Sequence, residues 1–194
     1  MTNNSNVKQK NNRHSIRLRG YDYSKDGWYF ITVCVHEFKE VFGEIKDEIF
    51  HANEWGNIVE ITLKETSKIR ENDTCIEVFQ IMPNHIHFII VIGSKENLPN
   101  IIGFPDTDSA LMEFSSPSKT VGAIVRGIKG RVTSQIQQKE EITDLKLWQR
   151  NYYERVIRDK NELHRIRNYI KQNPAKWQKD KAFFKKLLAR MIKR

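Results

Sequence analysis

The chain has little cysteine, no long hydrophobic run and fewer acidic than basic side chains. Its two cysteines, Cys34 and Cys75, stand far apart in apolar segments, which argues against a disulfide framework and a thiolate metal site. No apolar run approaches the ~20 residues that span a bilayer, and residues 1–15 lack the apolar segment of a secretion signal, so we expect a cytoplasmic protein without membrane contact. Lys and Arg outnumber Asp and Glu by 33 to 24, and the net charge of +9 favours an anionic partner, first of all nucleic acid.

The 194 residues are enough for one domain with a buried core, flanked by two basic ends. Residues 1–19 are rich in Asn, Lys and Arg and predict a mobile basic arm, because they hold too few apolar side chains to offset the entropy of ordering. Residues 20–177 contain strand-like and helix-like patterns, and residues 178–194 predict a basic C-terminal helix. Strands that are joined largely by hairpins and interleaved with helices predict an α+β fold with an antiparallel sheet.

The expected elements follow from composition and apolar spacing. Aromatic and β-branched residues predict strands, spacings of three and four residues predict helices, and no structure is assigned to the polar loop 93–117. The predicted elements are two strands within 28–45 joined by a turn near 36–40, a helix over 53–69, a hairpin of 75–82 and 85–92, a helix over 118–136, a strand within 147–157 and a helix over 159–173 that Pro174 ends.

Two histidines stand one residue apart at the start of the second hairpin strand. Because side chains alternate between the faces of a strand, His85 and His87 share one face with Ile89 and Val91. Two neutral imidazoles can bind a divalent ion. Taken alone, the spacing is more often that of two hydrogen-bonded histidines at a strand edge.

The predicted helix over 159–173 presents a second set of polar groups. Asn173 falls on the inward stripe formed by Leu163 and Ile170, and Tyr169 lies four residues before it at the edge of that stripe. A buried amide needs a partner, and a metal ion would be one. With a metal to polarise a phosphodiester, a tyrosine hydroxyl can attack phosphorus and form a covalent phosphotyrosine. The alternative for Tyr169 is a ring packed at the stripe edge with its hydroxyl in water.

Several segments, in order over about residues 15–177, resemble the HUH single-tyrosine transposases, and most closely the REP-associated tyrosine transposases. They are "RLRGYDYSKDGWYFITVCV" with "FGEI" after it, "MPNHIHFIIVI", "VGAIVRGIKGRVT" and "LWQRNYYERVIRDKNELHRIRNYIKQNPAKW". The resemblance implies a ferredoxin-like, RRM-type antiparallel sheet flanked by helices. It also implies a transposase that cleaves and rejoins single-stranded, hairpin-bearing DNA with Mg2+ or Mn2+ as cofactor.

The resemblance also assigns residues. His85 and His87 match the metal-binding pair, and Tyr169 matches the nucleophile on the late helix. Asn173 falls where the insertion-sequence branch has a metal-ligand glutamine, so this sequence departs from the pattern by one methylene group. The neighbouring tyrosines Tyr152 and Tyr153 are rival nucleophiles.

Basic side chains supply the expected DNA contacts. The expected phosphate-binding residues are Arg126, Lys129, Arg131, Arg150, Arg155 and Arg158. Two other functions stay open, namely an RRM-like module that binds single strands without chemistry and a nuclease that uses a metal-bound water. The sequence leaves the target DNA and the choice between monomer and homodimer open.

Overall fold

The computed structural model of the protein describes residues 26–70, 73–93 and 120–178. The predicted basic arm 1–19, most of the loop 93–117 and most of the predicted C-terminal helix 178–194 lie outside these residues. The elements in chain order are β1 (Gly27–Cys34), the 3-10 turn η1 (His36–Phe38), β2 (Gly43–Lys46), β3 (Ile49–Ala52), α1 (Glu54–Ile69), β4 (Thr74–Met82), β5 (His85–Ile92), α2 (Val121–Glu140), β6 (Tyr153–Ile157) and α3 (Lys160–Lys171).

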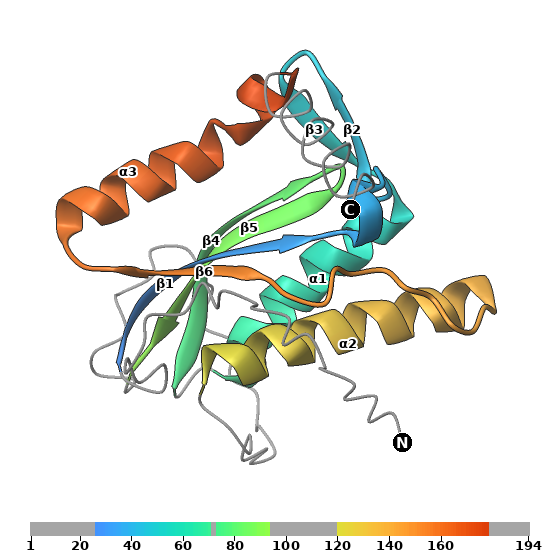
Figure 1. The fold of residues 1–194 in the computed structure, drawn as a ribbon, viewed down its shortest axis with the longest axis horizontal. Helices are drawn as coiled ribbons and strands as arrows, with labels where there is room; N and C mark the ends of the chain where they lie inside the picture. The colour runs from blue at the N-terminus through green and yellow to red at the C-terminus, as the bar shows by residue number, and fades with distance from the viewer. Residues whose placement is uncertain (1–25, 71–72, 94–119, 179–194) are drawn as a thin grey trace, which may run out of the picture.

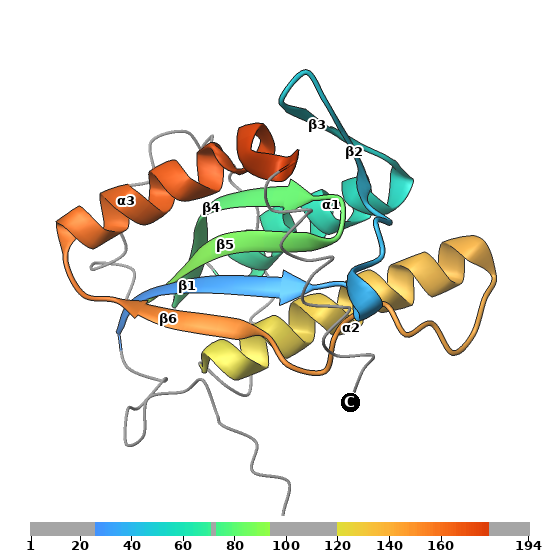
Figure 2. The same ribbon diagram turned by 45° about the horizontal axis from the view of Figure 1, so that its top comes forward.

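A four-stranded sheet forms the centre of the molecule, with the strand order β4-β5-β1-β6 and every neighbouring pair antiparallel. Helices α1 and α2 cover one face and α3 crosses the other, as Figures 1 and 2 show. The core between the sheet and α1 with α2 includes Tyr29, Phe88 and Ile128, and a smaller cluster under α3 includes Ile89 and Ile170. The predicted α+β class with an antiparallel sheet is confirmed.

Two strand predictions were wrong in extent. The segment after η1 leaves the main sheet, and β2 pairs instead with β3, a strand that the sequence did not indicate. Glycine is required at Gly43, which has a φ of 142° and where a Cβ would meet the His51 carbonyl oxygen at 2.1 Å. The strand expected within 147–157 is interrupted. Trp148 forms an isolated bridge with Val35, the carbonyls of Gln149 and Arg150 accept from the Lys129 ammonium, and β6 begins at Tyr153.

The helix boundaries follow the capping residues. The Asn53 side chain accepts a hydrogen bond from the Gly56 amide at the start of α1, and Asp159 accepts one from the Glu162 amide at the start of α3. The prediction that α3 continues to residue 173 was wrong, since the helix ends at Lys171. The chain turns at residue 172, and residues 173–178 are helical again, with Pro174 in the first turn of that segment, where its missing N–H costs little.

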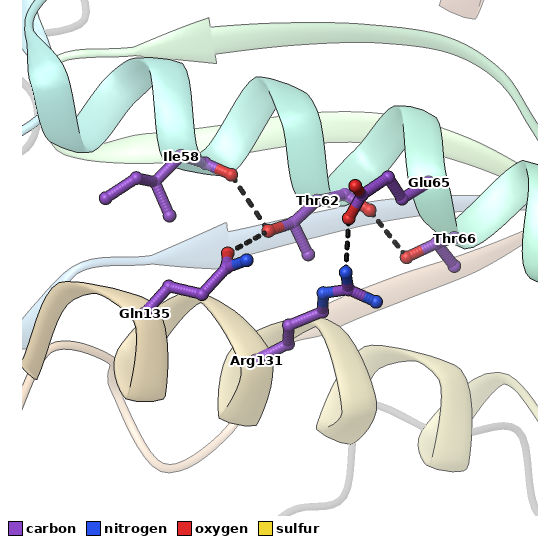
Figure 3. A network of polar contacts seen from close by, with 6 residues as sticks. All are labelled: Ile58, Thr62, Glu65, Thr66, Arg131 and Gln135. Carbon is purple, nitrogen blue, oxygen red and sulfur yellow. Dashed lines mark hydrogen bonds and ion pairs between the residues drawn. The ribbon is translucent and has the colours of Figure 1, made fainter. Parts of the chain in front are cut away.

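Helices α1 and α2 are joined by polar contacts that Figure 3 shows. The buried Thr62 hydroxyl lies 2.8 Å from the Ile58 carbonyl oxygen and 3.0 Å from the Gln135 amide oxygen. Arg131 forms an ion pair with Glu65 one turn further along α1. These contacts fix α2 against α1 and direct the Arg131 guanidinium towards α1. Among the described residues, no helix combines the length and the apolar character needed to cross a membrane.

Candidate functional site

The two histidines lie at the start of β5, on the face that α3 covers. They are almost completely buried, with exposed fractions of 1% for His85 and 4% for His87. The pairing of β5 with β1 places Cys34 opposite His85 and Thr32 opposite His87. The predicted alternation is observed, because Ile89 packs in the cluster under α3 with Phe30.

The hydrogen bonds of the two imidazoles bring their Nε2 atoms together. His85 Nδ1 lies 2.6 Å from Asn84 Oδ1, and His87 Nδ1 lies 2.8 Å from Thr32 Oγ1. The two Nε2 atoms are then 3.0 Å apart. The Nδ1 atom of His87 therefore faces β1, and that of His85 faces the β4–β5 turn. The two Nε2 atoms face each other.

These partners decide where the imidazole protons lie. The Asn84 Nδ2 donates to the Phe38 carbonyl at 3.3 Å, so its Oδ1 faces His85 and accepts from the Nδ1 proton of that ring. His85 Nε2 is therefore the acceptor nitrogen of that ring. The Thr32 hydroxyl can donate or accept, and so His87 has two arrangements. In one, His87 donates from Nε2 to His85. In the other, it donates from Nδ1 to Thr32, and both Nε2 atoms are acceptors.

Burial keeps both imidazoles neutral. It lowers the pKa of His85 from 6.5 to about 3, although contact with the Asn173 side chain partly opposes this decrease. It also lowers the pKa of His87 well below 6.5, with the proximity of His85 as a second cause. Neutral imidazole is the form that binds a metal ion.

Tyr169, Asn173 and Trp177 close over the histidines from α3 and the helical turn that follows it. The Tyr169 hydroxyl is 3.4 Å from His87 Nε2, and 39% of this residue is exposed. Asn173 is fully buried, and neither atom of its amide has a well-formed hydrogen bond. Trp177 is 3% exposed, with its ring centroid 6.2 Å from that of His85. Phe30 stacks on His87 at 5.4 Å and packs edge-on against Tyr169 at 6.0 Å.

The geometry fits a divalent metal ion. In the arrangement in which His87 donates to Thr32, both Nε2 atoms are acceptors 3.0 Å apart, and a cation contacted by both would remove their repulsion. Neighbouring ligands that each lie ~2.1 Å from an octahedral ion have this separation. The buried amide of Asn173 needs a partner of the same kind. The described residues contain no group of three or more His, Cys, Asp or Glu that could hold an ion, and the buried Asn173 amide is a candidate third ligand of another type.

The rival tyrosines lie on opposite faces of the sheet, Tyr153 as the first residue of β6 and Tyr152 directly before it. Tyr152 packs on the α2 side, where its hydroxyl donates to Glu154 at 2.9 Å. Tyr153 lies on the histidine side, 39% exposed, with its ring edge-on to Phe30 at 6.2 Å. Tyr169 contacts His87 directly, with ring centroids 5.3 Å apart.

Sequence reasoning missed the residues that hold the histidines, namely Thr32, Phe30, Asn84 and Trp177. Asn84 could have been found, because it directly precedes His85 and an asparagine side chain at a turn commonly accepts from a neighbour. Thr32 and Phe30 could not, because their place opposite β5 depends on which strands pair.

The expected DNA contacts divide into three locations. Arg126, Lys129 and Arg150 line one groove over α2, whereas Arg131 is paired with Glu65 beside α1. Arg155 and Arg158 lie on the α3 side. There Arg155 pairs with Glu162 at 2.5 Å, and Glu162 also accepts from the Arg158 backbone amide. These two contacts lower the pKa of Glu162, the backbone hydrogen bond most strongly.

Comparison with known proteins places the chain among relatives. No protein-family model matches the sequence. An uncharacterized protein of Haemophilus influenzae is 38% identical over 175 residues, which cover 88% of this chain and 93% of that protein. The chain belongs to the same family as this Haemophilus protein.

The comparison of folds agrees with the motifs. The fold is similar to that of a REP-associated tyrosine transposase solved with a REP hairpin, with a TM-score of 0.53 and 17% sequence identity. The match covers 82% of this chain and 73% of the transposase. The resemblance expected from the sequence is therefore confirmed at the level of the fold.

Proposed function

We propose that the protein is a metal-dependent transposase that cleaves and rejoins single-stranded, hairpin-bearing DNA, with Tyr169 as nucleophile. The observation that carries the proposal is the convergence of four groups beneath α3: the Nε2 atoms of His85 and His87, the buried Asn173 amide and the Tyr169 hydroxyl. A protein that only binds nucleic acid has no need for this arrangement. The fold shared with a REP-associated tyrosine transposase supports the same conclusion.

The metal site in this proposal consists of His85, His87 and Asn173. Mg2+ or Mn2+ bound there would neutralise charge on a phosphodiester and polarise its phosphorus. The chain's own residues preorganise the site, since Asn84 and Thr32 hold the two Nδ1 atoms and Trp177 packs near the His85 ring. This support orients the imidazoles before DNA arrives.

Tyr169 carries the covalent chemistry. Its hydroxyl oxygen forms a bond to phosphorus while the bond from phosphorus to the 3′ oxygen breaks, leaving a 5′-phosphotyrosine and a free 3′ hydroxyl. The phenol loses its proton and the 3′ oxygen gains one, and the 39% exposure of Tyr169 leaves a route to solvent. The reverse attack by a 3′ hydroxyl rejoins the strand, because the phosphotyrosine keeps the energy of the broken ester.

The test is incubation of the protein with labelled hairpin-bearing single-stranded DNA and Mg2+ or Mn2+, followed by a denaturing gel. We expect a protein-linked DNA band that disappears in Tyr169→Phe and in His87→Ala. Tyr152→Phe is the matched control, because its hydroxyl lies on the other face of the sheet beside Glu154. Cleavage without a linked band would indicate hydrolysis instead, and binding without cleavage would indicate a passive module. Loss of the band in Tyr153→Phe but not in Tyr169→Phe would move the nucleophile to β6.

A further inference from the structure

A groove of about 610 Å³ lies over α2, on the face of the sheet opposite the histidines. It runs between one side of α2 and the segment that leads into β6. We call it the α2 groove, and its lining includes Arg126, Lys129, Gly130, Trp148, Arg150 and Tyr152. The described residues that line it include three basic side chains and no carboxylate.

The basic side chains have different roles. Lys129 is half-buried, and its ammonium donates to the carbonyls of Gln149 at 2.6 Å and Arg150 at 3.4 Å. Burial lowers its pKa. Lys129 therefore anchors the far wall of the groove to α2. Arg126 and Arg150 are exposed, so their guanidinium groups can bind a phosphate backbone.

A glycine in the α2 groove has no structural reason within the fold. An added Cβ at Gly130 would meet nothing within 4 Å, and α2 would gain helix propensity from any ordinary side chain. Gly127, one turn earlier, is equally open but does not line the groove. A glycine that costs stability and relieves no internal contact leaves room for something that approaches the helix closely.

The α2 groove leads towards the histidines across the edge of the sheet. Strand β6 is an edge strand, and successive residues on it face opposite ways. Tyr152 lines the groove, while Tyr153 lies on the other face against Phe30, which stacks on His87. A chain that leaves the groove and passes over this edge arrives beside the candidate site.

We propose that the α2 groove binds a single-stranded segment of the DNA that the site cleaves. Phosphates contact Arg126 and Arg150, an unpaired base lies over Gly130 near the aromatic wall, and the strand crosses β6 to reach Tyr169. This proposal rests on the proposed function for the identity of the strand. Aromatic side chains and positive charge together are the usual means of holding unpaired bases, whereas paired bases offer no free face for stacking.

The test compares Gly130→Leu with Gly127→Leu, the matched control on the same helix. Binding of a short fluorescein-labelled single-stranded oligonucleotide is measured by anisotropy in EDTA, so that no cleavage contributes. We expect Gly130→Leu to raise the Kd about tenfold or more and Gly127→Leu to change it less than about twofold. In the double variant Arg126→Ala, Arg150→Ala, the slope of log Kd against the logarithm of the salt concentration should decrease by about two. Equal binding by the two leucine variants would overturn the proposal.

Further measurements test which nucleic acid occupies the groove, and they separate this question from whether the site cleaves DNA. If Gly130→Leu weakens binding of a blunt duplex as much as that of the single strand, the groove does not select unpaired bases. Tighter binding of the matching RNA would assign the groove to RNA rather than DNA. Binding is measured in EDTA and is therefore separate from the covalent chemistry. A groove effect without any covalent adduct would support this inference while refuting the proposed function.

Discussion

Replacement of Thr32 by valine tests whether the proton arrangement of the histidines controls metal binding. Valine has nearly the shape of threonine but offers His87 Nδ1 no partner, and with His87 only 4% exposed, water does not replace the lost hydroxyl. An unpaired buried donor costs about 1–3 kcal/mol. The ring avoids this cost by moving its proton to Nε2, from which it donates to His85 Nε2 at 3.0 Å.

Metal binding must reverse that proton transfer. Part of the cost of an unpaired Nδ1 donor on His87 then reduces the favourable free energy of metal binding. We therefore expect the Kd for Mn2+ to rise about 10- to 100-fold in Thr32→Val. Thr32→Ser keeps the hydroxyl and should bind as the wild type does. Thr66→Val is a control for the substitution itself, because the Thr66 hydroxyl donates to a carbonyl within α1, far along the chain from the histidines.

Isothermal titration calorimetry with Mn2+ measures the affinities, and long-range proton–nitrogen NMR of the metal-free protein reports which nitrogen of His87 is protonated. The Thr32→Val spectrum should show the Nε2-protonated form alone. The reasoning would be refuted by a Thr32→Val affinity within about twofold of the wild type, or by a Thr32→Ser variant as weak as Thr32→Val.

Two further predictions concern pH and the α1–α2 contact. Because the pKa values of His85 and His87 are lowered by burial, to about 3 for His85, the unfolded chain binds protons that the native chain does not once the pH falls below about 6.5. The free energy of unfolding, measured in urea, should therefore decrease as the pH falls from 6.5 towards 3, by up to about 1.4 kcal/mol per pH unit for each imidazole. If His87→Gln left the dependence of this free energy on pH unchanged, the reasoning would be contradicted. Arg131→Ala should lower the free energy of unfolding by no more than ~1 kcal/mol and weaken DNA binding less than Arg126→Ala does, since Glu65 holds the Arg131 guanidinium; equal losses of affinity would place Arg131 at the DNA.

Much of the fold follows from local patterns in the sequence. The period of two in residues 85–92 and the Pro83–Asn84 turn predict the central hairpin, and Asn53 marks the start of α1 as observed. The pairing of β2 with β3 could not be predicted, because it depends on a backbone at Gly43 that only a glycine adopts readily. Local propensity does not indicate which strands become neighbours.

The candidate site was predicted in part for the same reason. Helical spacing pointed Asn173 inward, and the structure buries it, although through a new helical turn after residue 172 rather than along α3. The roles of Thr32 and Trp177 arise from contacts between segments far apart in the chain, so no local pattern carries them. Arg131 and Arg126 were both expected to contact phosphates, and the ion pair of Arg131 with Glu65 separates the two.

The two open glycines of α2 also have a consequence for how this family diverges. Neither Gly127 nor Gly130 is needed to avoid a clash within the fold. Other side chains would stabilise the helix at both positions, so in the absence of a functional constraint we expect both glycines to be replaced. Under the proposed binding of a strand in the α2 groove, Gly130 is constrained because it lines the groove, and Gly127 is not because it lies outside it. Relatives that have lost the DNA substrate should therefore fill both positions, while relatives that still use it should keep a glycine at one and vary freely at the other.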